Sequence, residues 1–213
     1  MLMAWIRGLY GKLDTFGPPP LQEITTHYLQ SIKWTTDLWI KDLKVPPFPT
    51  INVHEVAKPG LVMKDDNVRV TATLVQHPPI VPALAYRFDF KDRAIVFSGD
   101  TVMADSLIEL AKGADVLVHE AMYLPALGEM IRALSGKNAS PQLGAQAMDH
   151  MLRDHTPVEQ VGIFAQKAGV KTLVLSHLTP GTDMLLVPTS AWFEQAKKHF
   201  SGEVIVGEDM MII

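Results

Sequence analysis

The sequence predicts an α/β (α+β) fold in which antiparallel strands are followed by alternating helices and strands. Short apolar runs separated by turn residues begin at Ile51, and after Ser98-Gly99-Asp100 apolar strands alternate with segments of helical periodicity. With 213 residues, of which 47% are hydrophobic, the chain can bury a substantial core. We therefore expect one globular domain over residues 1–213.

The amino-terminal part is expected to form two helices. Apolar spacing predicts helices over residues 1–13 and 21–40, with a short strand at 14–16 that stops at a glycine followed by three prolines. Residues 45–49 should be extended, because prolines lack an amide donor and disfavour helix in the residue before them.

The rest of the chain should contain a meander followed by a layered α/β arrangement. The expected meander strands are 52–56, 68–74, 83–89 and 94–97. Later strands (116–119, 172–176, 203–206) alternate with helices (105–112, 157–168, 189–200). One or two helices are expected between residues 123 and 154, where they should cover the predicted functional site. The later strands are nearly all apolar, as expected when a helix layer covers them.

Composition excludes several classes of function. There are 19 Lys+Arg against 23 Asp+Glu and no basic run, which argues against an extended nucleic-acid footprint. With 0 Cys, any metal must be held by His and carboxylate groups. The first twenty residues match neither a signal peptide nor a membrane span, so we expect a cytoplasmic protein without a membrane partner.

Polar side chains follow several of the expected strands. His119, Asp100 and His177 each come after an apolar run, and His77 ends another one before two prolines. Side chains at strand ends line the crevice where α/β folds bind ligands. Taken singly, a histidine at a strand end is more often a structural residue than a ligand, but together these residues form a donor set suited to Zn²⁺ or Mn²⁺.

His155 lies just before a predicted helix. Thr156 could be the helix N-cap with Pro157 in the first turn, which would place the imidazole of His155 on a loop facing the site. Such a group suits a general acid that protonates a leaving oxygen. The alternative is a surface histidine in a capping loop.

Four motifs in a fixed order carry a family resemblance. They are VFSGDT (96–101), LAKGADVLVHEA (110–121), HTPVEQ (155–160) and LVLSHLTP (173–180). Two weaker matches lie upstream, at TFGPPP (15–20) and around VQH (75–77). In order and spacing they resemble the carboxyl-terminal half of ribonuclease Z-like proteins of the metallo-β-lactamase superfamily.

The resemblance implies a metallo-β-lactamase-like αββα sandwich holding two metal ions, Zn²⁺ or Mn²⁺. It implies that His77 binds one ion, that Asp100 bridges both and that His177 binds the second. The chemistry it implies is attack by a metal-bound hydroxide on a phosphoryl or acyl centre.

The resemblance also implies roles for three residues around the metals. His155 would donate a proton or stabilise the leaving group. His119 and Glu120 match the HEA element of the family, and we expect them to orient the ligands or His155.

Two departures from the family pattern shape the expected function. No HxHxDH motif occurs, so the sandwich should be incomplete at its amino terminus. Only residues 78–99 join His77 to Asp100, which leaves no room for the long arm that grips tRNA in that family. We therefore expect a small-molecule ester substrate, such as a phosphodiester or sulfate ester, rather than tRNA.

Two hypotheses follow. The first is a metal-dependent hydrolase, possessing phosphodiesterase-type chemistry but impaired by the missing ligands. The alternative is a non-catalytic remnant of the same fold that acts as a binding or oligomerisation module. In both, a sheet face bared by the missing segment should be covered by a homo-oligomer such as a dimer.

Overall fold

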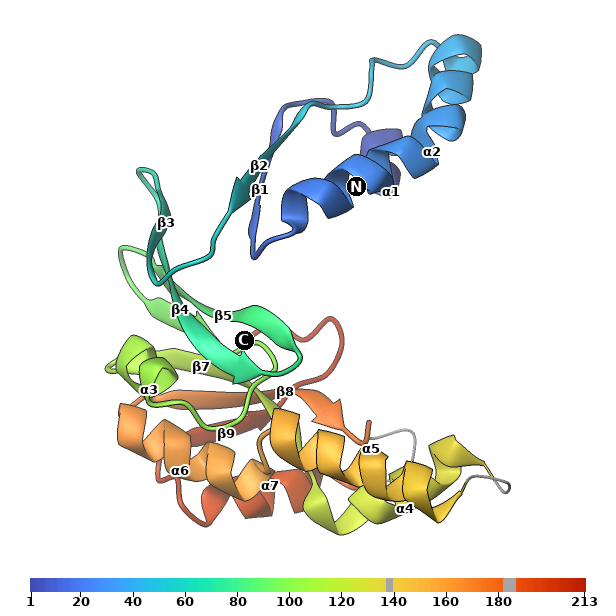
Figure 1. Cartoon of the computed structure of the whole chain (residues 1–213). Coiled ribbons are helices and arrows are strands. Elements are labelled where there is room, and N and C mark those ends of the chain that lie inside the picture. The colour runs from blue at the N-terminus through green and yellow to red at the C-terminus, as the bar shows by residue number, and fades with distance from the viewer. Residues whose placement is uncertain (137–139, 182–186) are drawn as a thin grey trace. The chain divides into compact units, whose positions relative to one another are not determined.

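The computed structural model describes residues 1–136, 140–181 and 187–213, which divide into two compact units, residues 1–57 and 58–213 (Figure 1). The expectation of one domain over the whole chain stays a prediction.

The first unit contains a two-stranded parallel sheet and two helices. Its elements are α1 (Leu2–Ile6), β1 (Leu13–Gly17), α2 (Leu21–Leu43) and β2 (Ile51–Glu55). The helix predicted over residues 1–13 is wrong beyond Ile6, because Gly8 takes a positive φ of 103° that ends the helical backbone. The assignment of residues 52–56 to the meander is also wrong, since β2 pairs with β1 in parallel.

The second unit is built on a seven-stranded mixed sheet. Its strands are β3 (Gly60–Lys64), β4 (Arg69–His77), β5 (Ile80–Asp89), β6 (Ala94–Phe97), β7 (Val116–Met122), β8 (Thr172–Thr179) and β9 (Glu203–Val206), in that spatial order. Strands β3 to β6 are antiparallel neighbours, and β6 to β9 are parallel neighbours. This confirms the α/β (α+β) prediction, although β3 was not foreseen.

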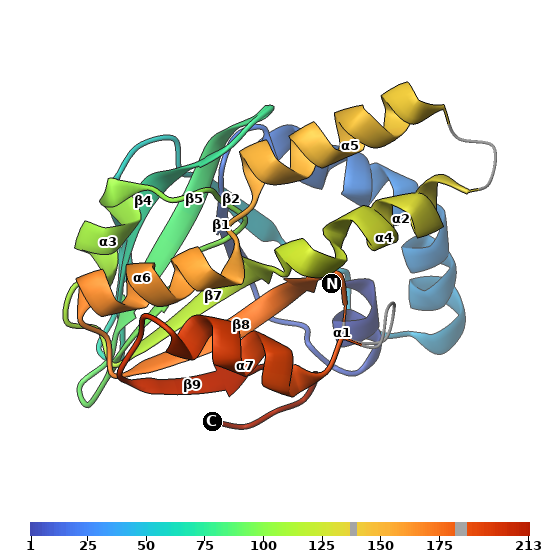
Figure 2. The same cartoon turned by 90° about the horizontal axis from the view of Figure 1, so that it is seen from below.

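Three helices cover one face of this sheet (Figure 2): α3 (Asp105–Ala111), α6 (Val158–Ala168) and α7 (Thr189–Lys197). Leu117, Leu173 and Leu175 point to this face and are fully buried with Phe164 of α6 and Trp192 of α7. Burying side chains of this size stabilises the fold by about 1.5–3 kcal/mol each. These strands are therefore apolar for the reason predicted from the sequence, which is that a layer of helices covers them.

The predicted helical region between residues 123 and 154 forms two helices, α4 (Leu124–Ser135) and α5 (Pro141–Asp154). They pack on each other around Met122, Leu127, Met130 and Ile131, a small core separate from the main one. The Pro141 ring occupies the first turn of α5, and Oγ of Ser140 accepts from the amide of Leu143 (3.2 Å), which fixes where this helix begins.

The other face of the sheet is apolar and less covered. Ile95, Phe97, Val118 and Val174 alternate with the residues that face the helices. A cavity of about 710 Å³ extends along this face. Its lining includes Arg93 and Val116 near the starts of their strands, Ser176 and His177 near the end of theirs, and Met211 and Ile213 of the carboxyl-terminal tail.

One edge of the sheet collects the carboxyl ends of β4, β6, β7 and β8. These strands share a direction, because β4 is antiparallel to β5, β5 to β6, and β6 is parallel to β7 and β8. Strand ends that meet at one edge bring together residues that are far apart in sequence.

In the described part of the chain, no helix is long and apolar enough to cross a membrane.

Candidate functional site

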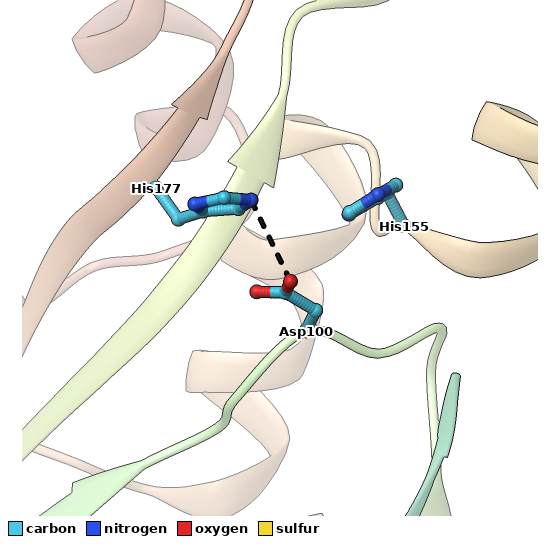
Figure 3. Close-up of side chains that lie close together, drawn as sticks. All are labelled: Asp100, His155 and His177. Atoms are coloured by element: carbon cyan, nitrogen blue, oxygen red, sulfur yellow. Dashed lines mark ion pairs between the residues drawn. The ribbon is translucent and has the colours of Figure 1, made fainter. Parts of the chain in front are cut away.

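Three potential metal ligands meet at this edge of the sheet (Figure 3): Asp100, His155 and His177. Each offers one ligand atom, and these atoms all lie within 4.8 Å of one another. Nε2 of His177 lies 3.6 Å from Oδ2 of Asp100, and the rings of His155 and His177 are stacked with centroids 6.0 Å apart. The group spans a range of exposure, from buried His155 to exposed His177, so solvent and substrate can reach one side of it.

Asp100 is placed by a tight turn after β6. Gly99 has a φ of 63°, and a Cβ at this position would lie 2.9 Å from the carbonyl oxygen of Leu84, so only glycine fits. Oγ of Ser98 accepts from the amide of Glu120 (3.1 Å), which ties the turn to β7. The turn therefore holds the Asp100 carboxylate at the end of β6.

His177 sits at an irregularity in β8. The pairing of β7 with β8 shifts there, so that Glu120 faces Ser176 and Ala121 faces Leu178, leaving His177 unpaired in the ladder. Its φ of 42° lies in the left-handed region, which a non-glycine residue adopts at a cost of about 1–3 kcal/mol. Such bulges often redirect a side chain beside a functional site.

Glu120 connects the loops that carry Asp100 and His155. Its side chain is 2% exposed, and Oε1 accepts from the amides of Thr156 (2.8 Å) and Thr101 (3.3 Å). Oγ1 of Thr156 also donates to the carbonyl of Thr101 (2.5 Å). These bonds fix the two loops relative to each other, as a group supporting metal ligands must do.

His155 faces the second oxygen of the same carboxylate. Its Nδ1 lies 3.5 Å from Oε2 of Glu120, an ion-pair contact longer than a hydrogen bond. Both atoms are buried and have no hydrogen-bond partner among the described residues. The Glu120 carboxylate raises the pKa of His155, while burial opposes this by disfavouring the charged ring.

His77, the last residue of β4, lies beside His155 rather than within the compact group. Its ring centroid is 5.2 Å from that of His155, and its Nδ1 lies 3.0 Å from the carbonyl oxygen of Asp154. Because a carbonyl only accepts, Nδ1 carries the proton and Nε2 is left free to bind a ligand. The metal-binding role of His77 stays a prediction.

His119 is not at the end of its strand, and that prediction is wrong, since β7 runs on to Met122. Its fully buried ring packs edge-on against Phe164 of α6, with centroids 5.3 Å apart, and Nδ1 lies 2.6 Å from the Glu120 carbonyl oxygen. Burial lowers the pKa of His119. The contact that supports its predicted role in orienting the site is the one with the backbone carbonyl of Glu120.

Sequence reasoning missed three residues at or beside the site, Thr101, Asp154 and His150, and assigned the wrong role to Thr156. Thr156 does not cap α6, whose N-cap is Pro157 without a side-chain bond; its hydroxyl holds Thr101 instead. Asp154 is fully buried. The available signal was an acidic residue directly before the candidate histidine His155. A carboxylate is seldom buried without a partner, so this position could have indicated a paired acid beside the site.

The donor set fits a divalent ion. Two imidazoles and one carboxylate within 4.8 Å are the ligands that Zn²⁺ or Mn²⁺ takes when thiolates are absent. His177 is exposed at this position, which leaves the group open to solvent as catalytic zinc sites are. Asp100 and His177 are therefore well placed to hold an ion, and His155 is close enough to act as a third ligand or as a proton donor beside it.

Comparison with known sequences gives consistent relatives. A family model described as "Beta-lactamase superfamily domain" matches residues 10–178. A putative ribonuclease Z of Mycobacterium tuberculosis (strain CDC 1551 / Oshkosh) is 31% identical over 216 residues, covering 99% of this chain and 88% of that protein. A ribonuclease Z of Mycobacterium avium (strain 104) is 29% identical, and the alignment covers 93% of this chain but 65% of the relative.

Solved structures resemble the chain in fold. The metallo-β-lactamase fold protein YhfI from Bacillus subtilis aligns with a TM-score of 0.59 and 18% identity, covering 97% of this chain and 67% of that one. The short form of human tRNase Z aligns with a TM-score of 0.51 and 20% identity, covering 95% and 67%. These likenesses concern the fold alone, and they confirm the predicted metallo-β-lactamase-like fold class.

Proposed function

Because this chain belongs to the β-lactamase superfamily, with ribonuclease Z proteins among its relatives, we propose that it is a metal-dependent hydrolase that cleaves a phosphodiester or a related ester. The observation that carries the proposal is the meeting of Asp100, His155 and His177 at one sheet edge. A bound divalent ion would supply a Lewis acid and a water of lowered pKa.

Asp100 and His177 hold the ion in this proposal, and His77 adds a further imidazole on the other side of His155. His155 donates the proton to the leaving oxygen. Two features support this role: Glu120 raises the pKa of His155, which favours the protonated ring, and the amide of Thr156, next to His155, donates to Oε1 of Glu120.

A small substrate is favoured over tRNA. Residues 78–99, between His77 and the turn that carries Asp100, are occupied by β5, β6 and short turns, so no extended arm leaves the sheet there. The candidate ligands are solvent-accessible on one side. A phosphodiester, sulfate ester or lactone could reach them without the recognition surface that a folded RNA requires.

The proposal is tested by loading the purified chain with Zn²⁺ or Mn²⁺ and assaying bis(p-nitrophenyl) phosphate, p-nitrophenyl sulfate and a lactone in parallel. We expect turnover of the diester that disappears in Asp100→Asn and His177→Ala. His199→Ala is the matched control, because His199 is a half-exposed histidine paired with Glu159 away from this group. No turnover of any of the three would overturn the proposal.

A second candidate function is self-assembly through the apolar face of the sheet. Phe97 is 44% exposed there, and the carboxyl-terminal tail adds Ile213, which lines the same cavity and is 59% exposed. A second copy of the chain would bring the same apolar face and tail, as a two-fold interface requires. Light scattering tests this: we expect a homodimer that Phe97→Asp shifts to monomer, and a monomeric wild type would exclude the assembly.

A further inference from the structure

A buried carboxylate beside the site has no part in the proposed chemistry. The side chain of Asp154, the last residue of α5, is fully buried. The guanidinium of Arg153 contacts both of its oxygens, with Nε 3.1 Å from Oδ1 and Nη2 3.3 Å from Oδ2. Nδ1 of His150, one turn earlier on α5, lies 2.5 Å from Oδ2.

This arrangement costs stability unless the carboxylate is well paired. Taking a carboxylate out of water carries a penalty of several kcal/mol, which partners offset only when the geometry is good. Arg153 and His150 are both about half exposed, so neither needs Asp154 for its own solvation. The contact of the buried Asp154 carboxylate with the half-exposed ring of His150 therefore serves to fix the position of that ring.

The ring that Asp154 fixes lies beside the site. The centroid of His150 is 6.5 Å from that of His155, with the two rings perpendicular. His155 is in turn neighbour to His77 at 5.2 Å and to His177 at 6.0 Å. His150 is therefore one of three imidazoles that neighbour His155, and its side chain is 49% exposed.

The contact with Asp154 also determines what His150 can offer. An ionised carboxylate only accepts, so Nδ1 carries the proton in this contact. The guanidinium of Arg153 contacts the same carboxylate, and Nε2 is the ring nitrogen of His150 that remains for a further contact. Among the described residues, Nε2 of His150 makes no hydrogen bond.

We propose that His150 is a further substrate-binding residue, held in place by Asp154, whose Nε2 accepts a hydrogen bond from a hydroxyl or amine group of the substrate near the scissile bond. The inference rests on the proposed function and narrows its substrate class to esters that carry such a donor. Asp154 is a positioning residue that acts through His150.

The test uses two diesters that differ by a single hydroxyl, propyl p-nitrophenyl phosphate and 3-hydroxypropyl p-nitrophenyl phosphate. In the metal-loaded wild type we expect the hydroxylated ester to have a KM about 3–10-fold lower, the worth of one hydrogen bond, with similar kcat. His150→Phe should remove this difference. His150→Gln, whose side-chain oxygen also accepts, should restore part of it, and His199→Phe should leave it unchanged.

A second readout does not depend on turnover. The affinities for the product analogues propyl phosphate and 3-hydroxypropyl phosphate, measured by calorimetry, should differ in the wild type and converge in His150→Phe. If no ester is hydrolysed, the proposed function fails while these affinities still decide the role of His150. Equal binding of both analogues by the wild type, or an unchanged preference in folded His150→Phe, would overturn the inference.

Discussion

Oε2 of Glu120 and Nδ1 of His155 face each other at 3.5 Å, both buried and with no hydrogen-bond partner among the described residues. Because the Glu120 carboxylate raises the pKa of His155, Glu120→Gln should lower that pKa in the metal-free protein. The substitution keeps an oxygen for the amides of Thr101 and Thr156, so the loops should stay in place. Titration of the histidine resonances by NMR measures the shift.

The sign of the stability effect follows from the direction of the shift. A histidine whose pKa is raised on folding stabilises the folded state below its unfolded pKa of about 6.5, and this contribution is lost as pH rises through the folded pKa. Glu120→Gln should therefore cost more stability at acidic pH than at alkaline pH. An identical His155 titration in both proteins would show that the pair does not interact.

His119 should have the opposite pH dependence. Burial lowers its pKa, so the imidazole binds a proton more readily in the unfolded chain than in the folded one. The free energy of unfolding should therefore fall as the pH drops below about 6.5. His119→Asn keeps a donor for the Glu120 carbonyl and removes the titration. Urea unfolding at about pH 5.5 and about pH 7.5 should show a smaller pH difference for the variant. His27→Asn, at an exposed position, is the control, and equal differences in all three proteins would refute the prediction.

Metal affinity should separate the ligands from the proton donor. Asp100→Asn and His177→Ala should weaken Zn²⁺ binding by more than the about 10–100-fold typical of supporting residues, whereas Glu120→Gln should stay within that range. His155→Ala should keep most of the affinity and lose turnover. Competition with a chromophoric chelator measures all four. A loss in His155→Ala as large as that in Asp100→Asn would make His155 a ligand instead of a proton donor.

Two helix glycines make a matched pair for packing. A Cβ at Gly162 of α6 would collide with the backbone carbonyl oxygen of Ala196 in α7, whereas at Gly144 of α5 the nearest atom is a methyl of Ile131 at 4.0 Å. Gly162→Ala should destabilise the protein by about 1–3 kcal/mol. Gly144→Ala should stabilise it by about 0.5–1 kcal/mol, because alanine favours helix. Thermal unfolding checks both, and equal shifts would contradict the close approach of α6 and α7.

Sequence patterns predicted the layered half of the fold well, because local periodicity reports burial. The expected strands 94–97 and 203–206 match β6 and β9 at both ends. Pairing partners were harder to predict: nothing local distinguishes residues 52–56 as a partner of β1 from a meander strand, since the choice depends on distant contacts. Strand β3 was missed because its residues are exposed or only partly buried and a register shift breaks its alternation.

The site was partly visible in the sequence. His77, Asp100 and His177 could be found because each ends or follows an apolar run, and His155 because of its motif. The side-chain direction of His119 was also available, since Leu117 and His119 share one face of a strand and Leu117 is apolar. The contacts of Asp154 with His150 and His77 could not be inferred, because they depend on how the end of α5 meets β4.

The residues of the candidate site come from four separate stretches: the end of β4, the turn after β6, the loop after α5 and the bulge in β8. None of these stretches can assemble the group alone, because their alignment requires β4 through β8 to be paired. Long-range pairing of this kind is slow, and ligand geometry should be among the last features acquired during refolding. Ion binding would then report when pairing of the whole sheet is complete. A cation present from the start of refolding would accelerate only the last step, in which the ligands come together.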